Sequence, residues 1–434
     1  MKHRNRIILT GMVGNLVESY DMAICGLLSV YFVKYLASDT FTGMLTVFAT
    51  FFAGYLARPI GAVFLGLLSD IYGRKITLAA SILCMGAATA LIGFIPDNSV
   101  IGVASMGCLL ILRMIQSFSC GAEYLNSSTY LVENATSSYK GYTGSWASFG
   151  AVAGLLIASI VTLVTSYWMD AYPELEKNIW RMPFILALLG STVGLYIRSR
   201  TPESLEYIMH YAENPKPKFG SLFSQSIKYV MANKLKTLYV FSLSCLGVTS
   251  TFLIYIYGPI QAHIYGNFNE HQIIISNIIA LSVMLLVSPI VGKLADKINR
   301  EKIIYAASFG FGVLSIPYFY FLSSKHYVAL VLIQAIIALP ASAYSATVTV
   351  MLTEMFPINM RCTVLSLLYA TAASLAAGLT PLLSLMLLRS TNLSVAPTLL
   401  IIVLIFLVWG VMWTRYLRER RISEIFHVQD YSKI

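Results

Sequence analysis

The stretch "GLLSDIYGRK", residues 66–75, is a short charged segment between two long apolar runs. A weaker copy, "GKLADKINREK" at residues 292–302, joins two further apolar runs in the second half of the chain. Glycines permit a tight turn, and an aspartate in each copy is placed to face the positive N-terminus of a helix. We expect the basic residues to stay at an anionic membrane surface. These segments are candidate gating loops, with Gly66, Asp70, Gly73, Arg74, Asp296 and Arg300 as their functional residues.

The composition indicates a membrane protein. Of the 434 residues, 57% are hydrophobic and 12% are charged, whereas a soluble domain has about 25% charged residues. Such a chain cannot cover itself with polar surface, so much of its exterior must contact lipid. A net charge of +10 could suggest nucleic acid, but the Lys and Arg residues cluster in short loops and tails. This distribution argues against a nucleic-acid partner. The six Cys residues form no C-x-x-C pair, so neither a zinc site nor a disulfide framework is indicated, and we expect no metal and no cofactor.

A membrane span needs about 20 apolar residues, and the sequence contains twelve candidates. One longer polar connection, residues 199–235, contains "ENPKPK" and reads as a surface linker with a short helix near Leu222 to Val230. The predicted spans are 7–33, 43–68, 76–95, 100–132, 141–166, 180–198, 236–265, 272–295, 302–323, 327–354, 361–388 and 395–416.

An even number of spans places both termini on one side of the membrane. Most of the 30 Lys and Arg residues fall on that side, which predicts that the termini and the linker are cytoplasmic. Arg58 and Arg113 lie inside spans. Only a few basic residues fall on the opposite side, namely Lys34, Lys177, Arg181, Lys325 and Arg389.

The repeated loop joins spans 2 and 3, and then spans 8 and 9, which are equivalent positions in two halves of six spans. The predicted fold is therefore an all-α integral membrane protein, with 12 transmembrane helices in two pseudo-symmetric six-helix bundles. We expect an N-terminal bundle over residues 1–198, a cytoplasmic linker over 199–235, and a C-terminal bundle with a short cytoplasmic tail over 236–434. We expect a monomer in a lipid bilayer.

Charges within the spans need an explanation, because each costs about 2.5–3.5 kcal/mol to insert. The first half contains Glu18, Asp21, Arg58, Arg113 and Glu123. At 1.5 Å per residue, Asp21 lies about 21 Å from the terminus side, Arg58 about 18 Å, Glu18 about 16 Å and Glu123 about 15 Å. These four are predicted to share a layer near the middle of the membrane. Arg113 lies about 15 Å further out than Glu123, so those two are not expected to pair.

Three carboxylates and one guanidinium at one depth cannot all remain charged and paired, so one carboxylate is expected to hold a proton. Glu18 and Asp21 are three residues apart and are predicted to share a helix face. Asp21 or Glu123 is the predicted proton carrier, Arg58 its movable partner, and Glu18 the most structural of the four. Arg113 is the candidate for an anionic substrate group, because guanidinium binds carboxylate through two hydrogen bonds. A static ion-pair network is the alternative.

The second half offers polar and aromatic groups instead of charges. Tyr255 and Tyr257 precede residues 258–259, Gly-Pro, where span 7 could break. Asn277 and Tyr369 lie in later spans. Broken helices and aromatic rings suit a substrate site at mid-membrane, so these four are candidate substrate contacts; packing or interfacial tyrosines are the alternative.

The sequence resembles the major facilitator superfamily, and within it the metabolite:proton symporters, which carry proline/betaine, α-ketoglutarate, citrate or shikimate. The matching motifs follow the family's order across nearly the whole chain: "GNLVESYD" (14–21), "ARPIGAVFLGLLSD" (57–70), "RMIQSFSCGAEY" (113–124), "GSW" (144–146), "WRMPF" (180–184) and "EMFPINMR" (354–361). Several family positions differ, which bears on substrate identity more than on architecture: Ser19, Ile71, Ser117, Ala147, Asn299 and Ala370.

The resemblance and the buried charges together predict a proton-coupled symporter in a bacterial inner membrane. It would import a small polar metabolite, an organic acid or a zwitterion, by alternating access. An exporter or antiporter of a siderophore or drug is an alternative, and so is a non-transporting membrane sensor with the linker as its output element. An enzyme is not expected, because no His falls well inside a span.

Overall fold

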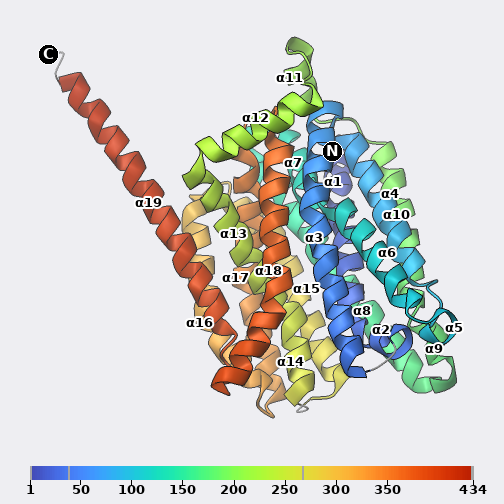
Figure 1. Cartoon of the computed structure of the whole chain (residues 1–434). Coiled ribbons are helices and arrows are strands. Elements are labelled where there is room, and N and C mark those ends of the chain that lie inside the picture. Colours follow the sequence, from blue (N-terminus) through green and yellow to red (C-terminus); the bar gives the residue numbers. More distant parts are fainter. Residues whose placement is uncertain (1, 38–39, 266–267, 432–434) are drawn as a thin grey trace.

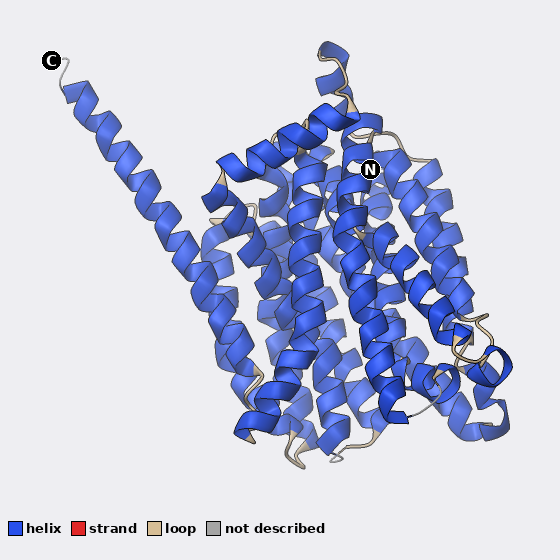
Figure 2. Ribbon diagram, in the orientation of Figure 1, coloured by secondary structure: helices blue, strands red, loops and turns tan. Residues whose placement is uncertain are grey.

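Helices make up the regular structure of this computed structural model, which describes residues 2–37, 40–265 and 268–431 (Figure 2). Within these residues, eleven helices are long and apolar enough to cross a membrane, and a bent helix pair makes a twelfth span when it is counted as one. The predicted all-helical membrane architecture is confirmed. The start of the first helix, the linker helices and the last turns of the final helix lie toward one end of the bundle, here called the terminus end (Figure 1).

The first six spans differ from the prediction mainly at the first one. Instead of a continuous helix over 7–33, two helices meet at a bend of 55° next to Leu28. The bend lets the ring of Phe32 pack against Trp180 and Phe184 in the core of the first half. The helices of this half are α1 (Lys2–Leu27), α2 (Ser29–Leu36), α3 (Thr40–Tyr72), α4 (Arg74–Ile92), α5 (Asn98–Ile101), α6 (Ala104–Cys120), α7 (Glu123–Glu133), α8 (Lys140–Ala171), α9 (Glu176–Ile179) and α10 (Met182–Ser199).

The linker holds two helices, α11 (Leu205–Glu213) and α12 (Phe219–Ala232), where the sequence predicted one short helix. Helix α11 is capped by Ser204, whose hydroxyl accepts a hydrogen bond from the backbone N–H of Tyr207 at 3.3 Å. A serine before a short amphipathic stretch is a recognised helix start, so the sequence carried a signal for this helix.

In the second half, span 7 was predicted to break at residues 258–259, but the chain stays helical there and only the type of helix changes. A π-helical turn, Leu253–Tyr257, ends immediately before Gly258. π-Helical segments are rare and are frequent at functional sites. The helices are α13 (Lys234–Phe252), α14 (Gly258–Tyr265), α15 (Glu270–Leu294), α16 (Arg300–Leu322), α17 (Tyr327–Glu354), α18 (Arg361–Thr391) and α19 (Thr398–Tyr431).

The two most extensive contacts between the halves are made by two helix pairs. Helix α3 packs on α18, and α8 packs on α15. These are spans 2 with 11 and 5 with 8, so they are equivalent under the exchange of halves. Apolar cores lie mainly within each half, which leaves room for polar groups where the halves face each other.

Candidate functional site

The first repeated loop joins the two halves at the terminus end. The carboxylate of Asp70 accepts hydrogen bonds from the backbone amides of Cys362 at 3.2 Å and Thr363 at 2.8 Å, and from the Thr363 hydroxyl at 2.7 Å. These amides belong to the first turn of α18. The aspartate therefore does face a helix N-terminus, and that helix belongs to the other half.

The second loop repeats this arrangement in reverse. Asp296 accepts hydrogen bonds from the backbone amides of Gly141 at 2.5 Å and Tyr142 at 2.9 Å, in the first turn of α8. Each half thus caps a helix of the other half with an aspartate. Arg300 forms an ion pair with Glu354 of its own half.

Arg74 does not lie at the membrane surface as expected. Its side chain is fully buried and forms ion pairs with Asp70 at 3.3 Å and Glu133 at 3.0 Å. The guanidinium also lies over the ring of Tyr207. Burial raises the pKa of Tyr207 to about 12, so its hydroxyl stays neutral and donates to the carbonyl of Ile71. Two carboxylates and an aromatic face together compensate the buried cation.

Glu133 extends this cluster to the second half, because it also pairs with Arg361 at 2.9 Å. The same arginine pairs with Glu206 of α11 at 3.0 Å. The terminus end is therefore closed by two aspartate caps and a set of ion pairs.

The two glycines of the first loop have different roles. Gly73 has a φ of +110° and forms the turn. Gly66 lies inside α3, which corrects the expectation of a turn there. A methyl group at Gly66 would lie 2.8 Å from the Cα of Thr363, so this glycine permits the close approach of α3 and α18.

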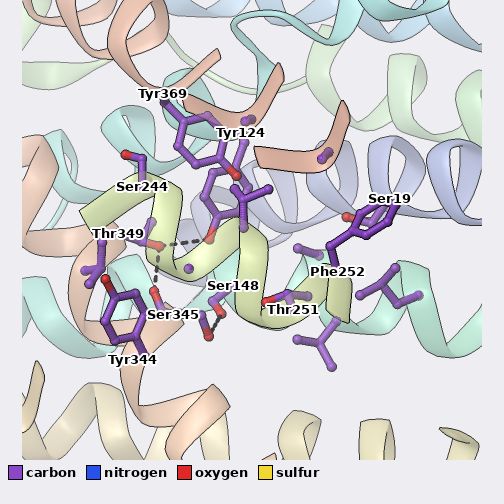
Figure 3. A pocket seen from close by; sticks show the side chains of 18 of the residues that line it. Ser19, Tyr124, Ser148, Ser244, Thr251, Phe252, Tyr344, Ser345, Thr349 and Tyr369 are labelled. Atoms are coloured by element: carbon purple, nitrogen blue, oxygen red, sulfur yellow. Dashed lines mark hydrogen bonds between the residues drawn. The ribbon is translucent and has the colours of Figure 1, made fainter. Parts of the chain in front are cut away.

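A cavity of about 210 Å³ lies between the halves. Its lining includes serine, threonine and tyrosine side chains from both halves (Figure 3). Two hydrogen bonds cross it: Tyr124 to Thr349 at 2.8 Å, and Ser148 to Ser345 at 2.8 Å. The ring of Tyr124 also stacks on Tyr369, with centroids 5.2 Å apart. Among the predicted substrate contacts, Tyr369 lies in this wall.

Glu18 and Arg58 are the charged residues among those that line the cavity. They form an ion pair with each other. One carboxylate oxygen of Glu18 and the Nε of Arg58 have no hydrogen-bond partner among the described residues. The wall therefore has no net charge, and each member of the pair has spare hydrogen-bonding capacity.

Asp21 is fully buried behind this wall, between α1, α4 and α6. One of its carboxylate oxygens accepts from the Thr89 hydroxyl at 2.8 Å, and the other has no hydrogen-bond partner among the described residues. Gln116 donates to the same threonine at 2.7 Å and accepts from Arg113 at 2.5 Å. The Arg113 guanidinium stacks on Phe51 and lies outside the cavity lining.

Glu123 has a partner that the sequence did not predict. Arg198, counted as a cytoplasmic charge at the end of span 6, is buried and pairs with Glu123. Glu123 also accepts hydrogen bonds from Ser81 at 2.5 Å and Ser127 at 3.0 Å. A signal was available, because the last turn of an apolar helix had an arginine and span 4 had an unpaired acid.

The four charges expected in one layer therefore lie in three separate groups. Glu18 pairs with Arg58, Glu123 pairs with Arg198, and Asp21 bonds to Thr89. The helical rise gives the depth of a residue but does not identify its neighbours. Glu18 and Asp21 point 60° apart around α1, so one reaches α3 and the other reaches α4.

The remaining second-half candidates do not line the large cavity: Tyr255 and Tyr257 belong to the π-helical turn, and Asn277 lies beside it. Tyr255 and Asn277 line a separate small cavity. Asn277 donates to the carbonyl of Tyr255 at 3.2 Å and accepts from Gln334 at 3.1 Å. Tyr257 is buried in the second-half core. Contact of these residues with substrate stays a prediction.

Two family models match the sequence. The one described as sugar (and other) transporter covers residues 7–218, and the one described as Major Facilitator Superfamily covers residues 243–426. A proline/betaine transporter of Salmonella typhimurium is 29% identical over 420 residues, which cover 94% of this chain and 82% of the relative. A glycine betaine/proline/ectoine/pipecolic acid transporter, OusA of Dickeya dadantii, is 28% identical over 417 residues, covering 93% and 82%. The resemblance predicted from the motifs is confirmed.

Solved structures support the fold. The partially occluded, inward-open xylose transporter XylE from E. coli has a TM-score of 0.72 and 17% identity, covering 94% of this chain and 98% of that one. XylE bound to 6-bromo-6-deoxy-D-glucose has a TM-score of 0.75 at 17% identity, covering 94% and 96%. At this identity the likeness shows the shared arrangement of helices alone.

Proposed function

Because the chain belongs to the major facilitator superfamily of membrane transporters, we propose that it is a proton-coupled symporter that imports a small polar metabolite by alternating access. One observation carries the proposal. A central cavity has a single ion pair, Glu18–Arg58, in its wall. Asp21, a buried acid with no ion pair in the described part of the chain, lies one helical turn from Glu18.

Asp21 is the proposed proton carrier. Glu18 and Glu123 each have a guanidinium partner, and protonating either would leave a buried cation uncompensated. Asp21 can take up or release a proton without breaking an ion pair. Arg113 reaches the same cluster through Gln116, so it is placed to respond to the charge on Asp21. Glu123 is the second candidate carrier. It is less favourable than Asp21 because its protonation would break the ion pair with Arg198.

The cavity wall favours a substrate without net charge. Glu18 and Arg58 cancel each other, so a zwitterion can bind there without leaving an unpaired charge in the membrane. Its carboxylate would pair with the Arg58 guanidinium and its cationic group with the Glu18 carboxylate. The relatives named as proline/betaine transporters support this class. An organic acid would instead require Arg58 to leave Glu18.

The energy supply fits uptake of such a substrate. At about 150 mV, one net inward charge supplies roughly 3.5 kcal/mol, which sustains a concentration gradient of a few hundredfold. A zwitterion moving with one proton uses this energy directly.

The proposal also includes the orientation of the protein in the membrane and the limits of its two bundles and linker. We place the terminus end in the cytoplasm of a bacterial cell, because the loops, the linker and the tails predicted on that side together carry most of the Lys and Arg residues. The units are an N-terminal bundle over 1–198, a linker over 199–235 and a C-terminal bundle over 236–434. The ends of α10 at Ser199 and the start of α13 at Lys234 support these limits.

The test is uptake into proteoliposomes with an imposed inward proton gradient. Radiolabelled proline, glycine betaine, dicarboxylates and shikimate would be compared, while alkalinisation of the outer medium is recorded. We expect Asp21→Asn to abolish accumulation driven by the gradient and to retain substrate exchange. Asp97→Asn is the matched control, since that acid pairs with Lys177 and Arg181 in a loop.

Three results would contradict parts of the proposal. Substrate uptake without alkalinisation of the outer medium would contradict proton symport. If Asp21→Asn and Glu123→Gln both accumulate substrate as the wild type does, neither residue is the proton carrier. Absence of flux for every compound, in folded protein, favours a sensor over a transporter of this class.

A further inference from the structure

Helix α12 of the linker has three distinct faces. One face, with Leu222 and Ser226, is buried against the bundle. A second face is polar and exposed, with Gln225 and Lys228. Between them runs an apolar flank of residues spaced by four, which are 37–63% exposed: Phe219, Phe223, Ile227 and Met231. At 100° per residue these four span about 120° of the helix surface.

The apolar flank continues the lipid-facing surface of the bundle. The ring of Phe219 lies 6.2 Å from that of Phe64, measured between centroids. Phe64 belongs to the span of α3 and is itself 45% exposed. Helix α12 contacts α3 and α18 and lies across the terminus end of the bundle (Figure 1). Its flank therefore adjoins the exposed apolar surface of the spans near the terminus end.

The charge of this segment is entirely positive. Residues 214–236 contain no Asp or Glu and hold five lysines: Lys216, Lys218, Lys228, Lys234 and Lys236. Four of these are exposed, while Lys236 packs over Tyr229 and Phe356. Lysines flanking an apolar helix surface attract anionic headgroups, by about fivefold in affinity for each lysine.

We propose that α12 is an interfacial helix that binds anionic phospholipid of the leaflet at the terminus end. Phe223 and Ile227 insert among the upper acyl chains, and the flanking lysines contact the lipid phosphates. The connection between the two halves is thereby attached to the membrane surface. This site is separate from the central cavity and does not depend on transport activity.

The depth of the flank can be measured with spin labels on the full-length protein in nanodiscs. Cysteine would be placed at Phe223, and at Gln225 as the matched control, after replacement of Cys84 and Cys108, the native thiols that are not buried. We expect the label at 223 to collide with oxygen and the label at 225 with a water-soluble nickel chelate. Equal exposure of both labels to the chelate would overturn the proposal, since the flank would then be free for a protein partner.

The charge requirement needs a second measurement. Phosphatidylglycerol would be added in increasing amounts to the purified protein in the presence of phosphatidylcholine, and the bound phosphatidylglycerol would be measured by native mass spectrometry. We expect a fourfold variant, Lys→Gln at 216, 218, 228 and 234, to need at least tenfold more phosphatidylglycerol for half-saturation. Lys34→Gln with Lys325→Gln, exposed lysines at the opposite end of the bundle, should change the midpoint by less than twofold. Equal losses in the two variants would overturn the assignment to α12.

Discussion

The aspartate cap on α18 allows a quantitative test of how the terminus end is held closed. Asp70 accepts three hydrogen bonds from residues 362–363, at 2.7–3.2 Å. Asparagine would keep one acceptor oxygen and lose both the charge and the second acceptor. A hydrogen bond to a charged group contributes about 1.5–3 kcal/mol, so Asp70→Asn should weaken closure by about 2 kcal/mol. That corresponds to a roughly 30-fold larger open fraction at this end. Arg74 keeps Glu133 as its partner, so no buried charge is left alone.

The assay is alkylation of a cysteine that is buried only while this end is closed. Ser128 is fully buried, and its hydroxyl lies 3.2 Å from that of Thr353 in the other half. In a background without Cys84 and Cys108, a cysteine at Ser128 should react about 30 times faster with a water-soluble maleimide in Asp70→Asn.

Two further variants complete this experiment. Asp296→Asn should act in the same direction, because it caps α8 from the opposite half. Glu176→Gln should have no effect, since its pair with Lys34 is exposed and lies in another loop. A reaction rate within twofold of wild type in Asp70→Asn, for protein that elutes normally in gel filtration, would refute closure by the caps.

Substitutions at the buried Glu123–Arg198 pair and at Gly150 test the packing of the first half. Removing one member of the buried pair, by Glu123→Leu or Arg198→Met, should lower the free energy of unfolding by about 3–5 kcal/mol; the double variant should recover most of this in detergent unfolding. Gly150→Ala should cost about 1–3 kcal/mol, because its methyl group would lie 2.2 Å from the carbonyl oxygen of Met12, whereas Gly107→Ala has open space and should be neutral in thermal unfolding.

The sequence predicted the architecture well because two independent patterns agreed. Apolar runs gave the spans, and the repeated loop placed Asp70 and Asp296 at equivalent positions in the two halves. The expectation that each faces a helix N-terminus was confirmed. Which helix it faces could not be predicted, since the partners are about 290 and 155 residues away and depend on how the halves dock.

The site was harder to predict. The position of a residue along a helix gives its depth in the membrane but does not show which neighbouring helix its side chain reaches. Arg198 ends a span and was taken for a surface charge, yet its long side chain reaches Glu123 inside the bundle. Arg113 stays the predicted contact for an anionic substrate group, whereas its hydrogen bond to Gln116 and its contact with the ring of Phe51 could not be predicted from the sequence. Which buried charges pair depends on the tilt and rotation of the helices, and these cannot be predicted from the sequence of the spans.

Helix α7 joins the central cavity to the closed terminus end in one short element. Tyr124, in its first turn, lines the cavity and bonds to Thr349 of the other half. Glu133, its last residue, pairs with Arg74 and with Arg361 of the other half. Tyr124 and Glu133 are nine residues apart in this helix, so the two contacts are about 14 Å apart along its axis. It is separated from α6 by a break at residues 121–122. A substrate that displaces Thr349 from Tyr124 therefore acts on the helix whose last residue, Glu133, forms the ion pairs at the closed terminus end.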